Sequence, residues 1–271
     1  KCFTEALNIQ EDFETMNHLV SAYSMANQTE KALDTLNRMV EMEPEHIQTL
    51  LTRVSVLFML DKEAEVIADC LRVIELDESN HLAWFLMAKA KRTTGDQLGA
   101  IADLTKAIAL KDDFTDAYLL RAEVLLAMKQ GQEALPDIEK AISLAPEEET
   151  TYLVRGKIHE SLGDLDAAAD DYQQALDLNP FNEDACILKG SLLITKNLLD
   201  EAIVFFDEAI EIKPDFAKAY AERGRAKNLK GDKEGAFEDL KKSIELNPEG
   251  EEAKKFEGQH ANFENKTYMP F

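Results

Sequence analysis

Four arginines in the chain are each followed, 16 residues later, by an aspartate. These pairs are Arg53 with Asp69, Arg121 with Asp137, Arg155 with Asp171 and Arg223 with Asp239. A guanidinium can hold a carboxylate through two parallel hydrogen bonds, so a row of arginines could bind an acidic ligand. The same chemistry can instead fix two parts of the chain to each other. Because each arginine comes with its own aspartate, we favour ion pairs inside the protein, which would contribute about 0–1 kcal/mol each if partly exposed.

The other potentially reactive side chains form no catalytic or metal-binding pattern. No two of the five histidines have the spacing of metal ligands on a helix, and neither a phosphate-binding glycine loop nor an HExxH motif occurs. His159 is expected at a packing position rather than as a catalytic base. Cys70 and Cys186 are expected to be buried, unreactive thiols. We therefore predict no catalytic residue, no cofactor, no metal and no enzymatic activity.

The segments that carry these residues recur every 34 residues. Prolines close similar phrases at Pro44, Pro146, Pro180, Pro214 and Pro248, and acids take the same place at Glu78 and Asp112. Seven units in register begin at Phe13, Ile47, His81, Thr115, Glu149, Glu183 and Ala217. Apolar spacings of three, four and seven predict two helices in each unit, and the proline ends the second one. Pro136 falls in the first turns of a second helix, where we expect a disturbed start and no break.

Small and large side chains also recur at fixed positions of each unit. The eighth position is glycine in the last three units, at Gly156, Gly190 and Gly224, and alanine or valine elsewhere. A small residue at a constant place predicts a close crossing of two helices. Replacing Gly190 with leucine should then destabilise the protein by about 1–3 kcal/mol through overpacking.

This pattern resembles the tetratricopeptide repeat (TPR) family over residues 13–248. The resemblance implies an all-α fold, a right-handed superhelical solenoid of seven helix-turn-helix repeats of 34 residues. Residues 1–12 would be the second helix of an incomplete upstream repeat, and residues 249–271 a C-terminal cap and tail. It also implies that the first helix of each repeat lines a concave groove.

The groove positions that the resemblance implies hold apolar residues between charged ones, which suits a peptide or a helical segment of a partner. The candidate partner-binding residues are Phe58, Phe85, Lys89, Arg92, Leu126, Lys157, Ile194 and Arg225. The alternative is that several apolar residues of this set only pack between neighbouring first helices. Acids and bases balance at these positions, so the excess negative charge should lie on second helices and loops.

The formal net charge of −23 disfavours nucleic acid and anionic membranes as partners. It also favours a neutral or basic partner segment through long-range repulsion of acidic ones. The three cysteines form no CxxC pair and fit a reducing compartment, so we expect a cytoplasmic protein. The predicted function is a non-catalytic protein–protein interaction scaffold or adaptor. The alternatives are the recognition or regulatory arm of a larger enzyme, with the catalytic domain elsewhere, and an oligomer formed through the terminal segments.

Overall fold

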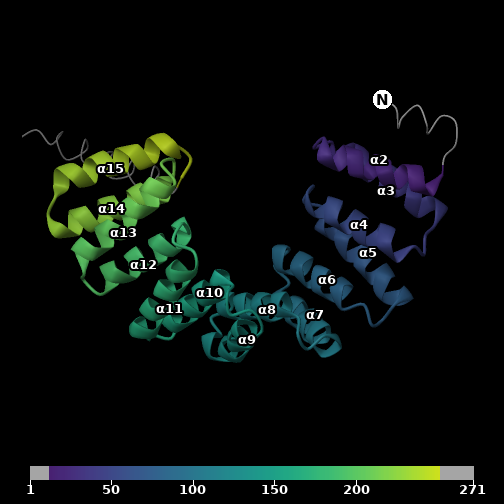
Figure 1. Cartoon of the computed structure of the whole chain (residues 1–271), viewed down its shortest axis with the longest axis horizontal. Helices are drawn as coiled ribbons and strands as arrows, with labels where there is room; N and C mark the ends of the chain where they lie inside the picture. The colour runs from purple at the N-terminus through teal and green to yellow at the C-terminus, as the bar shows by residue number, and fades with distance from the viewer. Residues whose placement is uncertain (1–11, 251–271) are drawn as a thin grey trace, which may run out of the picture. The chain divides into compact units, whose positions relative to one another are not determined.

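The computed structural model describes residues 12–250, and within that range every regular element is an α-helix. The helices form hairpin pairs that follow one another along the chain (Figure 1). The first helices are α2 (Phe13–Met25), α4 (Ile47–Phe58), α6 (His81–Thr93), α8 (Thr115–Ala127), α10 (Glu149–Ser161), α12 (Glu183–Thr195) and α14 (Ala217–Lys230). The second helices are α3 (Thr29–Met42), α5 (Glu63–Leu76), α7 (Gln97–Leu110), α9 (Gly131–Leu144), α11 (Leu165–Leu178), α13 (Leu199–Ile212) and α15 (Lys233–Leu246). The prediction of an all-α helical repeat solenoid is confirmed.

The chain divides into two compact units, Lys1–Ala145 and Pro146–Phe271, which we call unit 1 and unit 2. Within each unit the second helix of a pair contacts the first helix of the next pair, as α5 contacts α6 and α13 contacts α14. Consecutive first helices also touch, α4 with α6, α6 with α8 and α12 with α14. Each unit therefore presents a row of first helices. The upstream helix predicted over residues 1–12 and the cap predicted over 249–271 fall almost wholly outside the described residues.

The turn inside every pair uses the left-handed backbone region at the same place. The residues with positive φ in the described range are Asn27, Asp61, Gly95, Lys129, Gly163, Asn197 and Gly231. This conformation ends a helix and costs a non-glycine residue about 1–2 kcal/mol. After each of the three glycines, an aspartate caps the second helix, as Asp164 does by accepting a hydrogen bond from the Ala167 N–H at 3.1 Å.

Replacing Lys129 with glycine should raise the free energy of unfolding by about 1 kcal/mol. Lys129 has φ of 61° just after α8, and glycine adopts that conformation without steric cost. Chemical denaturation followed by circular dichroism measures the change. The control is Lys140→Gly, on the exposed face of α9, which should lose about 1 kcal/mol because glycine disfavours a helix interior. A loss of stability in both variants would contradict the argument.

The core of each unit combines small residues at helix crossings with large ones beside them. A Cβ added at Gly190 would lie 2.5 Å from Phe206 Cε1, and one added at Gly224 would lie 3.1 Å from the Ala236 carbonyl oxygen. Gly156 lies against the ring of Tyr172 in the same way. The predicted close contacts at these glycines are confirmed. Helix α9 also runs past Pro136 without a break.

Candidate partner-binding surface

The arginine–aspartate pairs form inside their own repeats. Arg121 donates from Nε and Nη2 to the two carboxylate oxygens of Asp137, both at 2.7 Å. The closest N–O distances in the other pairs are 2.5 Å for Arg53–Asp69, 2.6 Å for Arg155–Asp171 and 2.5 Å for Arg223–Asp239. All four aspartates are buried, with 3–6% of each residue exposed. The structural interpretation is confirmed, and the pairs are partly buried, with buried carboxylates and arginine side chains that are 18–27% exposed.

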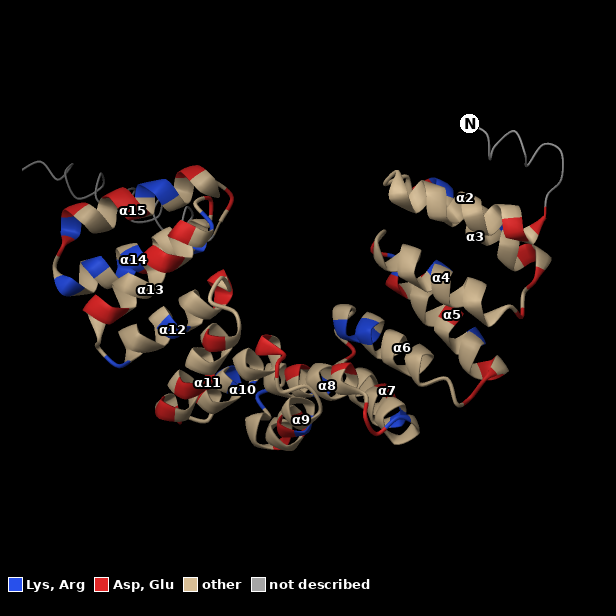
Figure 2. Cartoon of the chain, viewed as in Figure 1, with Lys and Arg blue, Asp and Glu red and all other residues tan. Residues whose placement is uncertain are grey.

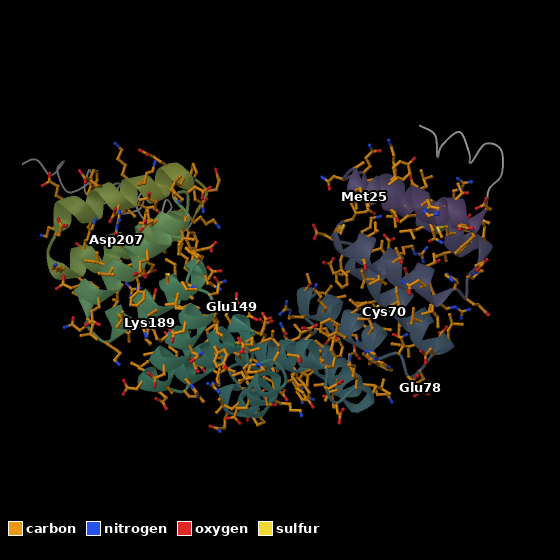
Figure 3. All side chains as sticks on the ribbon, viewed as in Figure 1. Met25, Cys70, Glu78, Glu149, Lys189 and Asp207 are labelled. Carbon is orange, nitrogen blue, oxygen red and sulfur yellow. The ribbon has the colours of Figure 1, made fainter. Side chains whose placement is uncertain are left out.

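Three of these arginines make a further contact that the sequence analysis missed. The Nη1 atom donates to the second helix of the preceding pair, at 3.1 Å from Arg53 to Asn37 and at 2.9 Å from Arg121 to Thr105. Arg223 does the same with Asp207, which is labelled in Figure 3. One side chain thus joins three helices from two consecutive repeats. An arginine held on both sides is not displayed for an acidic ligand.

A lysine or a histidine reaches the same aspartate position from one turn further along the first helix. Lys227 lies 2.8 Å from Asp239, and His159 Nδ1 lies 3.0 Å from Asp171 Oδ2. His159 is half-buried on α10. For Asp239, in the seventh repeat, burial by itself would raise the pKa. The hydrogen bonds from Arg223 and Lys227 outweigh the effect of burial, and the pKa of Asp239 is lowered below its ordinary value.

The first, third and sixth repeats lack the arginine pair, and in the first Leu19 and Thr35 stand at the two positions. In the third, Met87 replaces the arginine, and Lys91 alone holds Asp103 at 2.6 Å, so burial raises the pKa of Asp103. In the sixth, Lys189 faces no aspartate in its own repeat, where Phe205 stands at that position. Lys189 instead donates to the Ala169 carbonyl at 2.6 Å, and burial lowers its pKa.

The two cysteines among the described residues are buried free thiols. Burial raises the pKa of Cys70 to about 12 and that of Cys186 to about 11, so both thiols stay protonated and unreactive. Cys70 lies on α5, inside the helix pairs of unit 1 (Figure 3). No group of three His, Cys, Asp or Glu residues in this range has the geometry to hold a metal ion. Nor is any helix there long and apolar enough to cross a membrane.

Three of the predicted binding residues come together in a hollow between α6 and α8 in unit 1, with a volume of about 190 Å³. We call it the α6–α8 hollow. It is lined by Phe85, Lys89 and Arg92 from α6 and by Asp116, Leu119, Leu120 and Glu123 from α8. The ring of Phe85 is fixed by Phe114, which precedes α8, at a centroid distance of 4.9 Å. The hollow therefore has an apolar floor and a charged border.

The charges on this border are only partly paired. Arg92 Nη1 donates to Glu123 Oε2 at 2.6 Å, which joins the two helices and neutralises both groups. Lys89 Nζ instead lies 5.2 Å from the ring centroid of Phe58, on α4. A lysine at that distance from an aromatic face gains about 0.5–1 kcal/mol. Lys89, which lines the hollow, therefore also contacts Phe58.

The other four residues of the predicted set lie elsewhere. Leu126 is half-buried on α8 and does not line the hollow. In unit 2, Lys157 is exposed on α10, and Arg225 is exposed on α14 and pairs with Glu222 at 3.1 Å. Ile194 is only 6% exposed and belongs to the core of unit 2, so its assignment as an exposed anchor is wrong.

Unit 2 differs from unit 1 because its first helices bury the apolar residues of this face. Leu153 on α10 is 7% exposed and Ile187 on α12 is 1% exposed, whereas Phe85 and Leu119, at the same position of α6 and α8, remain half-exposed. Leu119, Asp116 and Glu123 were not among the predicted binding residues. Their shared positions in consecutive repeats could have identified the hollow.

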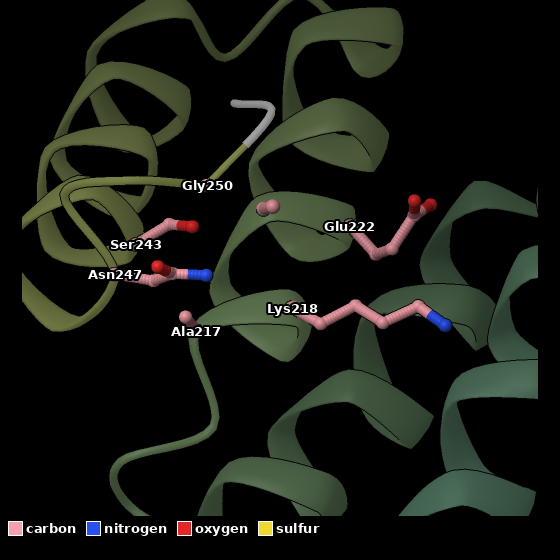
Figure 4. Close-up of a pocket in the computed structure, with 7 residues that line it drawn as sticks. Ala217, Lys218, Glu222, Ser243, Asn247 and Gly250 are labelled. Carbon is pink, nitrogen blue, oxygen red and sulfur yellow. The ribbon is translucent and has the colours of Figure 1, made fainter. Parts of the chain in front are cut away.

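A second hollow, of about 270 Å³, lies at the end of the described part of unit 2 (Figure 4). It is lined by Ala217, Lys218, Ala221 and Glu222 of α14, by Ser243 of α15, and by Asn247 and Gly250, which follow α15. In the two preceding pairs, the residues equivalent to Ser243 are Ala175 and Ala209, both fully buried.

Comparison with known proteins agrees with this architecture. Models of the tetratricopeptide repeat match residues 153–215, and 115–148 with 217–249. A solved MamA protein is 26% identical, with 61% of this chain and 91% of that chain covered at a TM-score of 0.53. The solved structure titled as YrrB, "a TPR protein with an unusual peptide-binding site", is 24% identical, with 70% and 97% covered at a TM-score of 0.52.

A tetratricopeptide repeat protein from Parabacteroides merdae is 15% identical and shares the fold over 89% of this chain and 96% of that one, at a TM-score of 0.74. A search of curated proteins found no match. The 34-residue helix pairs, the family models and these solved structures agree: the chain is a tetratricopeptide repeat protein.

Proposed function

We propose that the protein is a non-catalytic interaction scaffold that binds a protein or peptide segment across the first helices of unit 1. The observation that carries this proposal is the α6–α8 hollow, with Phe85, Leu119 and Leu120 in its lining. Its volume of about 190 Å³ is below the roughly 300–1,000 Å³ typical of small-molecule sites. One apolar side chain of a larger partner fits such a space better than a whole cofactor or substrate.

Apolar residues are also exposed at the ends of the first helices α2 and α4. Phe58 on α4 is half-buried, and Met59, which follows it, is 71% exposed. Met25, labelled in Figure 3 at the end of α2, is 90% exposed. Exposed methionines are adaptable contacts at binding surfaces. Tetratricopeptide repeats generally serve as non-catalytic interaction modules. We propose Leu126, Lys157 and Arg225 as secondary contacts of the partner.

A photo-crosslinking amino acid placed at position 85 tests where a partner lies. We expect p-benzoylphenylalanine at Phe85 to capture a defined partner in the cells that make this protein. The matched control is the same residue at Leu98, which is 71% exposed on the second helix α7 and should not capture it. Equal capture at both places would refute the location.

The Phe85→Ala/Leu119→Ala double variant should then weaken binding of that partner at least tenfold. Buried apolar anchors carry most of the free energy at interfaces, and their truncation typically costs about 2 kcal/mol or more. Calorimetry measures the affinity, and an unchanged circular dichroism spectrum shows that the variant is folded. Leu98→Ala is again the control and should bind like the parent. Parent-like binding by the double variant would refute the proposal.

A further inference from the structure

We propose that the bound segment carries an acidic side chain beside the apolar residue that fills the α6–α8 hollow, and that Lys89 receives it. This inference rests on the proposed function and adds the chemistry of the partner. It concerns an Asp or Glu within the segment, not a terminal carboxylate. Three features of the surface around Lys89 support it.

Lys89 is a cation without a carboxylate of its own. It is exposed on α6, and no acid of the described residues lies within ion-pair distance of it. The closest acid along its face of α8 is Glu123, at the same position of the next repeat, and Glu123 is taken by Arg92 at 2.6 Å. The positive charge of Lys89 is therefore not neutralised from this side.

The helix on the other side adds no negative charge. Helix α4 (Ile47–Phe58) contains no acid, and its one basic residue, Arg53, is held by Asp69 and Asn37. The residue of α4 at the position of Lys89 is Ser55. Figure 2 shows this helix almost free of charged residues beside the many acids elsewhere in the chain.

Asp116, the other acid that lines the hollow, is too far from Lys89 along the helix direction to form an ion pair with it. Asp116 stands seven positions earlier in the repeat, which is about 10 Å along a helix axis. Lys89 itself is held in place over the ring of Phe58, so little side-chain freedom is lost when it binds a carboxylate. An acidic group at Lys89 would lie next to the apolar floor formed by Phe85, so the two partner residues must be close together.

The net charge of −23 does not oppose this contact. Charges more than about 8 Å apart are largely screened at physiological salt, so the net charge acts mainly on the approach of a partner. The local contact is decided by the unpaired lysine. The sequence-based expectation of a neutral or basic segment is therefore replaced by an apolar residue with an acidic neighbour.

Selection from a random peptide library on phage tests the inference. The peptides are fused through their C-termini, so any preference for acids must come from side chains. The baits are the whole chain, its Lys89→Glu variant and the matched control Lys140→Glu, at an exposed lysine of the second helix α9. We expect the parent and the control to enrich an aromatic or aliphatic residue with Asp or Glu close by. Lys89→Glu should instead enrich Lys or Arg beside that residue.

A selected peptide is then synthesised with its acid replaced by the corresponding amide. The parent should bind the amide form about fivefold more weakly, and Lys89→Glu should show no such loss. Enrichment of apolar residues without acids, or an acid preference that survives in Lys89→Glu, would overturn the inference and leave the proposed function standing. If the selected peptides bind the Phe85→Ala/Leu119→Ala variant with the same affinity as the parent, the proposed function is overturned instead.

Discussion

Replacing Arg121 with methionine should lower the free energy of unfolding by about 3–5 kcal/mol. The change leaves the carboxylate of Asp137, which is 6% exposed, without a cation, and an unpaired buried charge is strongly destabilising. It also removes the hydrogen bond from Arg121 to Thr105 on α7, so two repeats lose a shared link. Urea denaturation followed by circular dichroism measures the loss.

Three comparisons separate the ion pair from a general effect of losing an arginine. The double variant Arg121→Met/Asp137→Leu should recover most of the loss, because apolar residues of similar volume replace buried ion pairs with little cost. Arg223→Met should lose less than Arg121→Met, since Lys227 still lies 2.8 Å from Asp239. Arg225→Met, at an exposed residue of the same helix as Arg223, should change stability by less than about 0.5 kcal/mol. A loss for Arg121→Met no larger than this would refute the argument.

The spacing of these residues predicted the pairs, but not the contacts around them. Arginine and aspartate recur together, so their partnership is visible in the sequence. The role of Lys91 is not, because it depends on Met87 leaving Asp103 without an arginine. The bonds from arginine to the preceding repeat involve Asn37, Thr105 and Asp207, three different residue types, and a search for one repeated residue misses them.

The binding face shows the same limit. The repeat register placed Phe58, Arg92, Leu126 and Ile194 at the same position of four first helices, yet only Ile194 is buried. Register fixes the direction of a side chain on its helix. Exposure depends also on how closely the neighbouring helices pack, and unit 2 buries this face more than unit 1 does. The hollow at Phe85 therefore required the structure.

Replacing Gly190 with leucine should destabilise the protein by about 1–3 kcal/mol. Even the Cβ atom of a new side chain would lie 2.5 Å from Cε1 of Phe206, which is fully buried and has no space to move into. Overpacking of this kind forces side chains from their preferred rotamers and shifts the backbone. Thr195→Leu, at an exposed residue of the same helix, is the control and should change stability by less than about 0.5 kcal/mol.

The third repeat suggests how the chain can tolerate a larger residue at this position. There Ala88 stands at the position of Gly190 and Leu104 at that of Phe206, and both are fully buried in one core cluster. Gly190→Ala alone should therefore be destabilising although alanine favours a helix by about 1 kcal/mol over glycine. Adding Phe206→Leu should make the alanine favourable relative to the Phe206→Leu single variant, because the smaller side chain frees the space that the Cβ needs. If the effect of Gly190→Ala is the same with phenylalanine and with leucine at position 206, the ring does not set the size limit, and the contact assigned to Gly190 is wrong.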